Sequence, residues 1–228
     1  MTTEDRPRED RQSGDGVKRV GGSLCLDFVN SVRARLPAGA DSSGREWMSR
    51  IADERLTSYE ALVRWGAATE AVGAGDVSAL LRSAAERPVA AQAVHGRALA
   101  LREAIYRIFK ATLEGWRIPP ADLAILNDEV RIARGHERIV AAVPPRWEWA
   151  GSPEDLDRVL WPIAVDAAAL LTAPELERVG QCPGTECGWL FLDRSRSGRR
   201  RWCDMADCGN LAKVRRHRER GRARRAGG

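Results

Sequence analysis

Residues 182–208 read CPGTECGWLFLDRSRSGRRRWCDMADC and contain four of the five cysteines of the chain. Cys182 and Cys187 enclose four residues, Cys203 and Cys208 enclose four more, and fifteen residues separate the two pairs. Two close pairs of cysteines are the usual way in which a protein delivers four thiolates to a tetrahedral Zn²⁺ ion. The spacing therefore predicts one zinc ion held by Cys182, Cys187, Cys203 and Cys208.

Such an ion is expected to have a structural role. Four cysteines complete the tetrahedral shell and leave no position for water or substrate, and a module this small buries too little apolar surface to fold without metal. The strand-like run 189–192, a turn at 195–198 and a return at 201–202 predict a hairpin between the two cysteine pairs. The alternative interpretation is four buried cysteines without metal. Cys25, in a distant apolar run, is interpreted as a small buried residue.

Positive charge is concentrated at the C-terminal end. Residues 181–228 contain 13 Arg or Lys and 5 Asp or Glu, a net charge of +8, whereas the other 180 residues carry 24 basic and 27 acidic groups, a net charge of −3. Asn210 is placed to cap a helix beginning near Leu211, and we expect Leu211 and Val214 to pack on the zinc core. A basic helix joined to a zinc module favours a polyanionic partner.

The candidate nucleic-acid contacts form two basic groups, one on the predicted hairpin and one on the helix. Guanidinium groups suit phosphate oxygens and guanine edges. The sequence does not distinguish DNA from RNA, because Trp189 and Trp202 are expected to pack on the zinc core and not to stack on bases. The alternative is a solvated basic tail without a dedicated partner. The candidates are Arg199, Arg200, Arg201, Lys213, Arg215, Arg216, Arg218 and Arg220.

The chain before the cysteines is predicted to be mainly helical. Apolar periodicity and helix start and stop residues place helices near 57–71, 76–87, 88–113, 120–134 and 152–171. Thr57 and Glu60 have the spacing of a capping box, and Pro162 is expected to kink the last helix. Two short alternating runs, 138–143 and 146–150, predict a small β hairpin.

The predicted fold class is therefore mainly α: a helical N-terminal domain with a minor β hairpin, followed by a small treble-clef or zinc-ribbon-like module. The expected domains are a disordered tail at 1–19, the helical domain at 20–178, the zinc module with its basic helix at 179–220, and a disordered basic tail at 221–228. Asp27 and Asn30 lie three residues apart among apolar residues. They are candidates for a ligand pocket, although capping or bridging of helices is the favoured interpretation.

Several classes of function are disfavoured by the sequence. Residues 1–19 lack the apolar centre of a signal peptide, and no apolar stretch is long enough to span a bilayer, so we expect a soluble cytoplasmic protein without a membrane partner. No metalloprotease, nucleophile-elbow, P-loop or dinucleotide-binding motif is present, which predicts that the chain is not an enzyme. The sequence does not indicate the oligomeric state.

The C-terminal motif resembles a known family. Residues 182–218, with the closing Cys208-Gly209-Asn210 and the run AKVRRHR at 212–218, resemble the bacterial CGNR-type zinc finger. Residues 24–31, LCLDFVNS, resemble the opening of the ABATE domain that accompanies this finger. Together the matches cover most of the chain and imply a stress-induced transcription regulator whose finger binds DNA. The chain departs from the pattern at Leu211, where the family has arginine, so one basic contact is missing.

We therefore expect a two-part regulator. The helical domain would sense a small-molecule ligand or mediate association, and the zinc module would place its basic helix on DNA. Two alternatives remain open from the sequence. The first is a protein that binds structured RNA or the ribosome. The second is a redox-responsive switch in which oxidation of the thiolates releases zinc.

Overall fold

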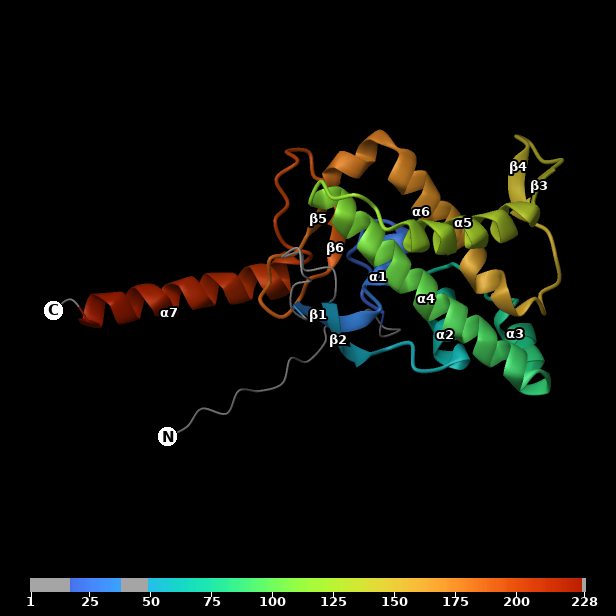
Figure 1. Cartoon of the computed structure of the whole chain (residues 1–228), viewed down its shortest axis with the longest axis horizontal. Helices are drawn as coiled ribbons and strands as arrows, with labels where there is room; N and C mark the ends of the chain where they lie inside the picture. Colours follow the sequence, from blue (N-terminus) through green and yellow to red (C-terminus); the bar gives the residue numbers. More distant parts are fainter. Residues whose placement is uncertain (1–16, 38–48, 227–228) are drawn as a thin grey trace.

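The computed structural model describes residues 17–37 and 49–226. This part of the chain forms seven α-helices and three two-stranded antiparallel sheets (Figure 1). The mainly α fold class is confirmed. The helices are α1 (Leu24–Val29), α2 (Tyr59–Ala68), α3 (Val77–Glu86), α4 (Pro88–Leu113), α5 (Pro120–Gly135), α6 (Trp161–Thr172) and α7 (Asn210–Ala226).

The longest helix, α4, runs through the helical body and packs against α1, α2, α3, α5 and α6 (Figure 1). It begins at Pro88, whose fixed φ and missing N–H suit the first turn of a helix. Its inner face buries Leu101, Ile105, Ile108 and Phe109, each at most 1% exposed. The predicted helices at 76–87, 88–113 and 120–134 are confirmed.

Two predicted details of helix starts are wrong. Ser58 and not Thr57 caps α2, because the Ser58 hydroxyl accepts a hydrogen bond from a first-turn backbone N–H at 3.1 Å. Glu60 therefore lies one position too early for a capping box. Pro162 does not kink a helix, since the 3₁₀ helix η1 (Leu156–Leu160) ends before it and Pro162 lies in the first turn of α6. A proline there removes no helical hydrogen bond.

A hairpin that the sequence did not predict follows α1. Strand β1 (Val32–Pro37) pairs antiparallel with β2 (Ser49–Glu54), where the sequence analysis had assigned a mainly helical segment. The pattern is obscured because Arg35 is buried despite its charge, at 3% exposure. Its guanidinium pairs with Glu103 at 2.7 Å and lies 4.0 Å from the centroid of the Tyr106 ring. Only the tertiary partners make an arginine acceptable at this position.

The predicted hairpin near residues 138–150 is confirmed. Strand β3 (Glu137–Val140) pairs with β4 (Arg146–Trp149) at the end of the molecule opposite α7 (Figure 1). Trp149 packs on Trp161 of the helical core, with ring centroids 5.9 Å apart. The hairpin is thereby anchored at its base.

A short strand separates two hydrophobic cores. Strand β6 (Leu190–Leu192) pairs with β5 (Val179–Gln181), and its two leucines belong to the core of the helical body. Trp189 and Phe191 point the other way and pack with the four clustered cysteines. Successive side chains of a strand alternate between faces, so one strand closes both cores.

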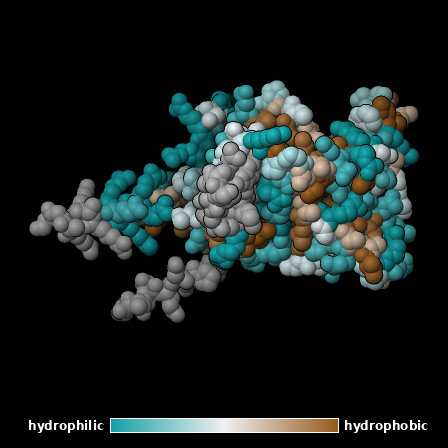
Figure 2. Space-filling model, viewed as in Figure 1, coloured by the Kyte–Doolittle hydropathy of each residue, from teal (hydrophilic) through white to brown (hydrophobic). Residues whose placement is uncertain are grey.

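The last helix, α7, projects away from the body, and Figure 2 shows mainly hydrophilic residues on the coloured part of it, next to the body. It continues to Ala226, so the predicted disordered tail at 221–228 is wrong in its boundary. At the other end, residues 1–16 lie outside the described ranges, whereas Val17, Lys18 and Arg19 are placed against the rest of the fold. Among the described helices, none is long and apolar enough to cross a membrane.

Candidate metal centre and nucleic-acid interface

The structure brings the four predicted cysteine ligands together. Cys182 and Cys187 lie in the loop between β5 and β6, and Cys208 lies in the π-helical turn η3 (Met205–Gly209) that leads into α7. All four Sγ atoms lie within 4.8 Å of one another and all four residues are buried. The predicted hairpin between the two cysteine pairs is wrong, because residues 201–202 form no strand and β6 pairs with β5 instead. The hairpin encloses the first cysteine pair.

The sulfur geometry fits a tetrahedral metal and excludes disulfides. The Sγ atoms of Cys187 and Cys203 are 3.5 Å apart, and those of Cys203 and Cys208 are 3.7 Å apart. A disulfide bond would bring two sulfurs to about 2.05 Å. Four thiolates about 2.3 Å from a zinc ion would lie roughly 3.8 Å from one another. The two Sγ–Sγ distances are therefore close to those expected between ligands of one zinc ion.

The protonation of the cluster also favours a cation at its centre. Hydrogen bonding from Cys187, followed by bonding from Cys203 and Cys208, lowers the pKa of Cys182 well below its ordinary value. Hydrogen bonding to Cys182 raises the pKa of both Cys187 and Cys203. Without a cation the four thiols cannot all ionise, because neighbouring thiolates repel one another. A metal ion removes this conflict and can bind all four thiolates.

Glycines make the tight path of the first cysteine pair feasible. Gly188 has φ +65°, and a Cβ atom at this position would lie 2.6 Å from the carbonyl oxygen of Arg35. A Cβ on Gly184 would lie 3.0 Å from the Cβ of Cys187. The loop can therefore pass between the β1–β2 hairpin and the cysteine cluster only with small residues at these positions.

The N-terminal segment of the described chain holds the metal module from outside. Lys18 pairs with Asp204, the residue before η3, at 3.0 Å and also with Asp207 within η3. The backbone N–H of Leu192 donates to the carbonyl oxygen of Gly21 at 2.7 Å. The sequence analysis assigned Lys18 to a disordered tail, and its polar neighbours gave no signal of this contact.

Asn30 links the helical body to the metal module. Its side-chain amide donates to the Leu190 carbonyl oxygen at 2.7 Å and its Oδ1 accepts from the Leu190 N–H at 3.0 Å. The Trp189 indole N–H donates to the carbonyl oxygen of Val32 at 3.1 Å. These contacts favour the interpretation of Asn30 as a bridge, and Asn30 lines neither the cavity beside the cysteine cluster nor the one beside Asp166.

The side chain of Asp27 likewise forms a hydrogen bond with the backbone. Its Oδ1 accepts a hydrogen bond from the Gly21 N–H at 2.7 Å, and the residue is 9% exposed. Burial raises the pKa of Asp27 from its ordinary value of 3.8 to about 6, although the hydrogen bond from Gly21 opposes the shift. The carboxylate fixes the chain turn before α1 and, like Asn30, lines neither pocket.

Cys25 is fully buried and lies next to Asp166, which accepts a hydrogen bond from the Cys25 backbone N–H at 2.7 Å. Desolvation, followed by the nearby Asp166 charge, raises the pKa of this thiol well above its ordinary value. A buried, protonated thiol is a poor nucleophile. The interpretation of Cys25 as a small core residue is supported.

The three adjacent arginines of the predicted hairpin have different environments. Arg199 and Arg201 are exposed, as expected of phosphate contacts. Arg200 instead donates to the carbonyl oxygens of Val20 at 2.7 Å, Leu192 at 3.2 Å and Trp202 at 3.0 Å, and also to that of Cys203. Its guanidinium lies 4.5 Å from the centroid of the Phe191 ring. The prediction that Arg200 contacts nucleic acid is corrected: its donors are used inside the fold.

Asp193 closes the loop that carries these arginines. Its carboxylate accepts from the backbone N–H of Ser195 and from that of Arg200, both at 2.8 Å. The side-chain hydrogen bond from Ser195, followed by the backbone bond from Arg200, lowers the pKa of Asp193. The loop between these anchors presents Arg194, Arg196 and Arg199 to solvent.

The start of α7 differs from the prediction. Asn210 has helical backbone angles and is the first residue of α7, while Asp204 caps the preceding turn through the Ala206 N–H at 2.8 Å. Leu211 and Val214 are 44% and 41% exposed, so the prediction that they pack on the metal core is wrong. The predicted contacts Lys213, Arg215, Arg216, Arg218 and Arg220 are all exposed.

Two family models match the chain. Residues 22–174 match ABATE, described as "putative stress-induced transcription regulator", and residues 178–221 match the CGNR zinc finger. The chain belongs to the ABATE family. None of the curated proteins matches it. The ABATE domain and the CGNR finger adjoin one another in sequence, and in space they share the two faces of β6.

The exposed Arg199 and Arg201 and the half-buried Arg200 give a matched set of variants. We expect Arg200→Met to destabilise the protein by about 3 kcal/mol, because it leaves several carbonyl oxygens without a donor. Arg199→Met and Arg201→Met should each change the free energy of unfolding by less than about 0.5 kcal/mol. Chemical denaturation monitored by tryptophan fluorescence measures all three. If all three substitutions changed the free energy of unfolding equally, the distinction between Arg200 and the exposed Arg199 and Arg201 would be contradicted.

Asp27 makes the stability of the ABATE domain depend on pH. Its pKa is raised in the folded state, so the stability it contributes is present below its unfolded pKa and is lost as pH rises from about 4 to about 6. Asp27→Asn keeps an acceptor for the Gly21 N–H and removes the charge. Relative to wild type, this variant should gain up to about 3 kcal/mol between these pH values. Chemical denaturation at several pH values tests this prediction, with Asp128→Asn, a substitution at an exposed position, as the control. A difference in unfolding free energy between Asp27→Asn and wild type that does not vary with pH would refute it.

Proposed function

We propose that this ABATE protein is a zinc-dependent DNA-binding transcription regulator, with a single structural zinc in the CGNR finger. The observation that carries the proposal is α7, an exposed basic helix that starts at the cysteine cluster and projects from the body (Figure 1). The family descriptions support a zinc finger and a role in transcription. DNA as the ligand, and the identity and number of the metal ions, are our own proposals.

The charge of α7 favours a polyanionic partner. Residues 210–226 include eight basic residues and one acidic residue, a net charge of +7. Arg215 and Glu219 form an ion pair at 3.8 Å, but like charges three or four residues apart repel one another along the rest of the helix. A helix that is polar on all sides gains no stability from a core. Phosphates would neutralise this repulsion and stabilise the helix.

The dimensions of α7 suit duplex DNA. Seventeen residues of α-helix extend over roughly 25 Å, and the major groove admits a helix. Arg199 and Arg201, with Arg194 and Arg196 on the same loop, provide a second exposed basic group beside the finger. We propose that α7 enters the groove and that this loop contacts the flanking phosphates.

The remaining parts of the proposal concern the ABATE domain. This domain binds a ligand or a partner and does not catalyse a reaction. The protein acts in the cytoplasm, and the domain conveys a signal to the finger. The interlocking of the two parts supports this last point, since Asn30, Val32 and Gly21 all bond directly to β6 or to Trp189. A change in the ABATE domain would therefore be transmitted to the base of α7 through these contacts.

Metal removal provides the first test. We expect one zinc per chain by elemental analysis, and Cys203→Ser should lose it while Cys25→Ala should retain it. Chelation should lower the unfolding temperature of the whole chain by on the order of 10 °C or more, because the shared strand loses the core on one face. Metal content near zero in the wild-type protein, or no change in melting on chelation, would contradict the proposal.

Substitution of the basic helix provides the second test. Arg215→Ala combined with Arg216→Ala should weaken binding to duplex DNA and reduce the slope of log K against log salt by about 1.8, because each phosphate contact contributes about 0.9. The control is Arg64→Ala combined with Arg82→Ala, which removes the same charge from exposed positions on α2 and α3. Affinity is measured by fluorescence anisotropy over a salt series.

The same anisotropy measurement, with other DNA fragments and structured RNA as competitors, distinguishes DNA from RNA as the partner. DNA-fragment selectivity at physiological salt supports a sequence-specific regulator. Stronger competition by structured RNA than by duplex DNA would replace the proposal with RNA binding. Equal loss of affinity in the helix variant and in the charge-matched control would mean that the protein binds through net charge alone.

A further inference from the structure

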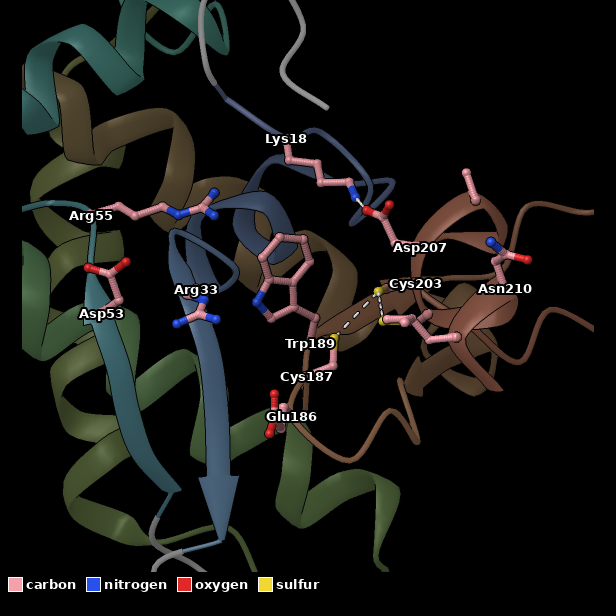
Figure 3. Close-up of a pocket in the computed structure, with 13 residues that line it drawn as sticks. Lys18, Arg33, Asp53, Arg55, Glu186, Cys187, Trp189, Cys203, Asp207 and Asn210 are labelled. Carbon is pink, nitrogen blue, oxygen red and sulfur yellow. Dashed lines mark hydrogen bonds and ion pairs between the residues drawn. The ribbon is translucent and has the colours of Figure 1, made fainter. Parts of the chain in front are cut away.

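A cavity of about 430 Å³ lies between the ABATE domain and the CGNR finger, at the base of α7 (Figure 3). Its lining includes Arg33 and Arg55 from the β1–β2 hairpin, Glu186 and Asp207 from the finger, and Trp189 between them. The volume falls in the range of small-molecule sites, which commonly occur between domains. Cys187, Cys203 and Cys208 also line it, so the cavity borders the metal centre, whereas none of the exposed basic residues proposed to contact DNA lines it.

Charges of opposite sign lie on the two sides of the cavity. In Figure 3 Arg33 and Arg55 lie on one side of Trp189, whereas Cys203 and Asp207 lie on the other. Asp53 reduces the positive charge of the first side. The finger side is more negative, because four thiolates around a divalent ion retain two negative charges. Lys18 adds little positive charge to the cavity, since it is paired with Asp204 and Asp207.

Three charged side chains of the lining are available to a ligand. In the part of the chain that the structure describes, Arg33, Asp53 and Glu186 are exposed and form no salt bridge within the protein. In Figure 3 Arg33 and Asp53 lie on the β1–β2 hairpin, and Glu186 lies beside Cys187. Asp53 has φ 63°, and strained backbone in non-glycine residues is concentrated at functional sites.

We propose that this cavity binds a small zwitterion whose carboxylate and amine are separated by a short apolar chain. The carboxylate contacts Arg33, the amine contacts Glu186, and the chain lies near Trp189. A simple anion would be repelled by the finger side, and a simple cation would leave Arg33 without a partner. A molecule with both charges satisfies both sides.

The cavity reaches the first residues of the basic helix. Asn210 and Leu211 line it, so the cavity extends from the β1–β2 hairpin to the start of α7. Occupancy would therefore favour one orientation of α7 relative to the ABATE domain. This regulatory consequence rests on the proposed function, whereas the binding of the zwitterion does not.

The binding test uses the full-length metal-loaded protein with 4-aminobutyrate and 6-aminohexanoate as probes. Hexanoate and hexylamine are the matched controls, since each lacks one of the two charges. Calorimetric titration should show at least one zwitterion binding at least 10-fold more tightly than either single-charge analogue. Equal affinities for zwitterion and analogues, or no zwitterion binding, would overturn the proposal.

Substitutions locate the site. Arg33→Gln and Glu186→Gln should each weaken zwitterion binding about 10-fold, because each removes one charged contact. Arg50→Gln, an exposed arginine of β2 outside the cavity lining, should stay within twofold of wild type. Both cavity residues are exposed, so the variants should fold, and unchanged melting temperatures verify this. Unaltered affinity in both cavity variants would refute the assignment.

A separate arm measures DNA affinity with and without the zwitterion. If the zwitterion changes the DNA affinity of the wild-type protein but not that of Arg33→Gln, the regulatory role is supported. If the DNA affinity of the wild-type protein does not change, the regulatory role is rejected, and calorimetry still tests whether the cavity binds the zwitterion. If the protein does not bind DNA at all, the proposed function fails, and the titration of the cavity remains a valid test.

Discussion

Strand β6 is buried on both faces, and it joins the helical body to the metal centre. Leu190 and Leu192 complete the core of the helical body, and Trp189 and Phe191 complete the core around the cysteines. A strand this short gains little from its backbone bonds alone, and its position is fixed by burial on both sides. A shift by one residue would place leucines on the metal and aromatic rings in the helical core. The metal centre and the helical domain therefore fix each other's register.

Polar contacts then complete the junction. Asn30 satisfies both backbone groups of Leu190, and Arg200 binds carbonyl oxygens from the N-terminal segment, from β6 and from the second cysteine pair. These carbonyl oxygens would otherwise lie at a junction with few backbone partners, and an unsatisfied buried polar group costs about 1–3 kcal/mol. The finger is thus built into the ABATE domain and is not a module on a flexible linker. The direction in which α7 leaves the body is consequently fixed at its base.

In contrast to its base, most of α7 makes few contacts with the rest of the protein. Beyond its first turns the helix has no apolar face and no neighbouring element among the described residues (Figure 1). Its charge is arranged around all sides, so it has no preferred face for packing on protein. The fold thereby combines a rigid base, held by metal ligands and β6, with a basic extension whose stability depends on its electrostatic surroundings. The cavity between β1 and the finger lies at the boundary of these two regions.

The cysteine cluster, the helices at 76–87, 88–113 and 120–134, and the β3–β4 hairpin could all be predicted from the sequence. These features depend on local signals: the spacing of two cysteine pairs, apolar periodicity, and prolines at helix starts. The β1–β2 hairpin, the pairing of β5 with β6, and the different roles of Arg199 and Arg200 could not be predicted and became evident in the folded structure. Each of these depends on partners distant in the sequence. When an arginine has arginine neighbours, the local sequence does not show whether its guanidinium will donate hydrogen bonds to water or to carbonyl oxygens of a distant segment.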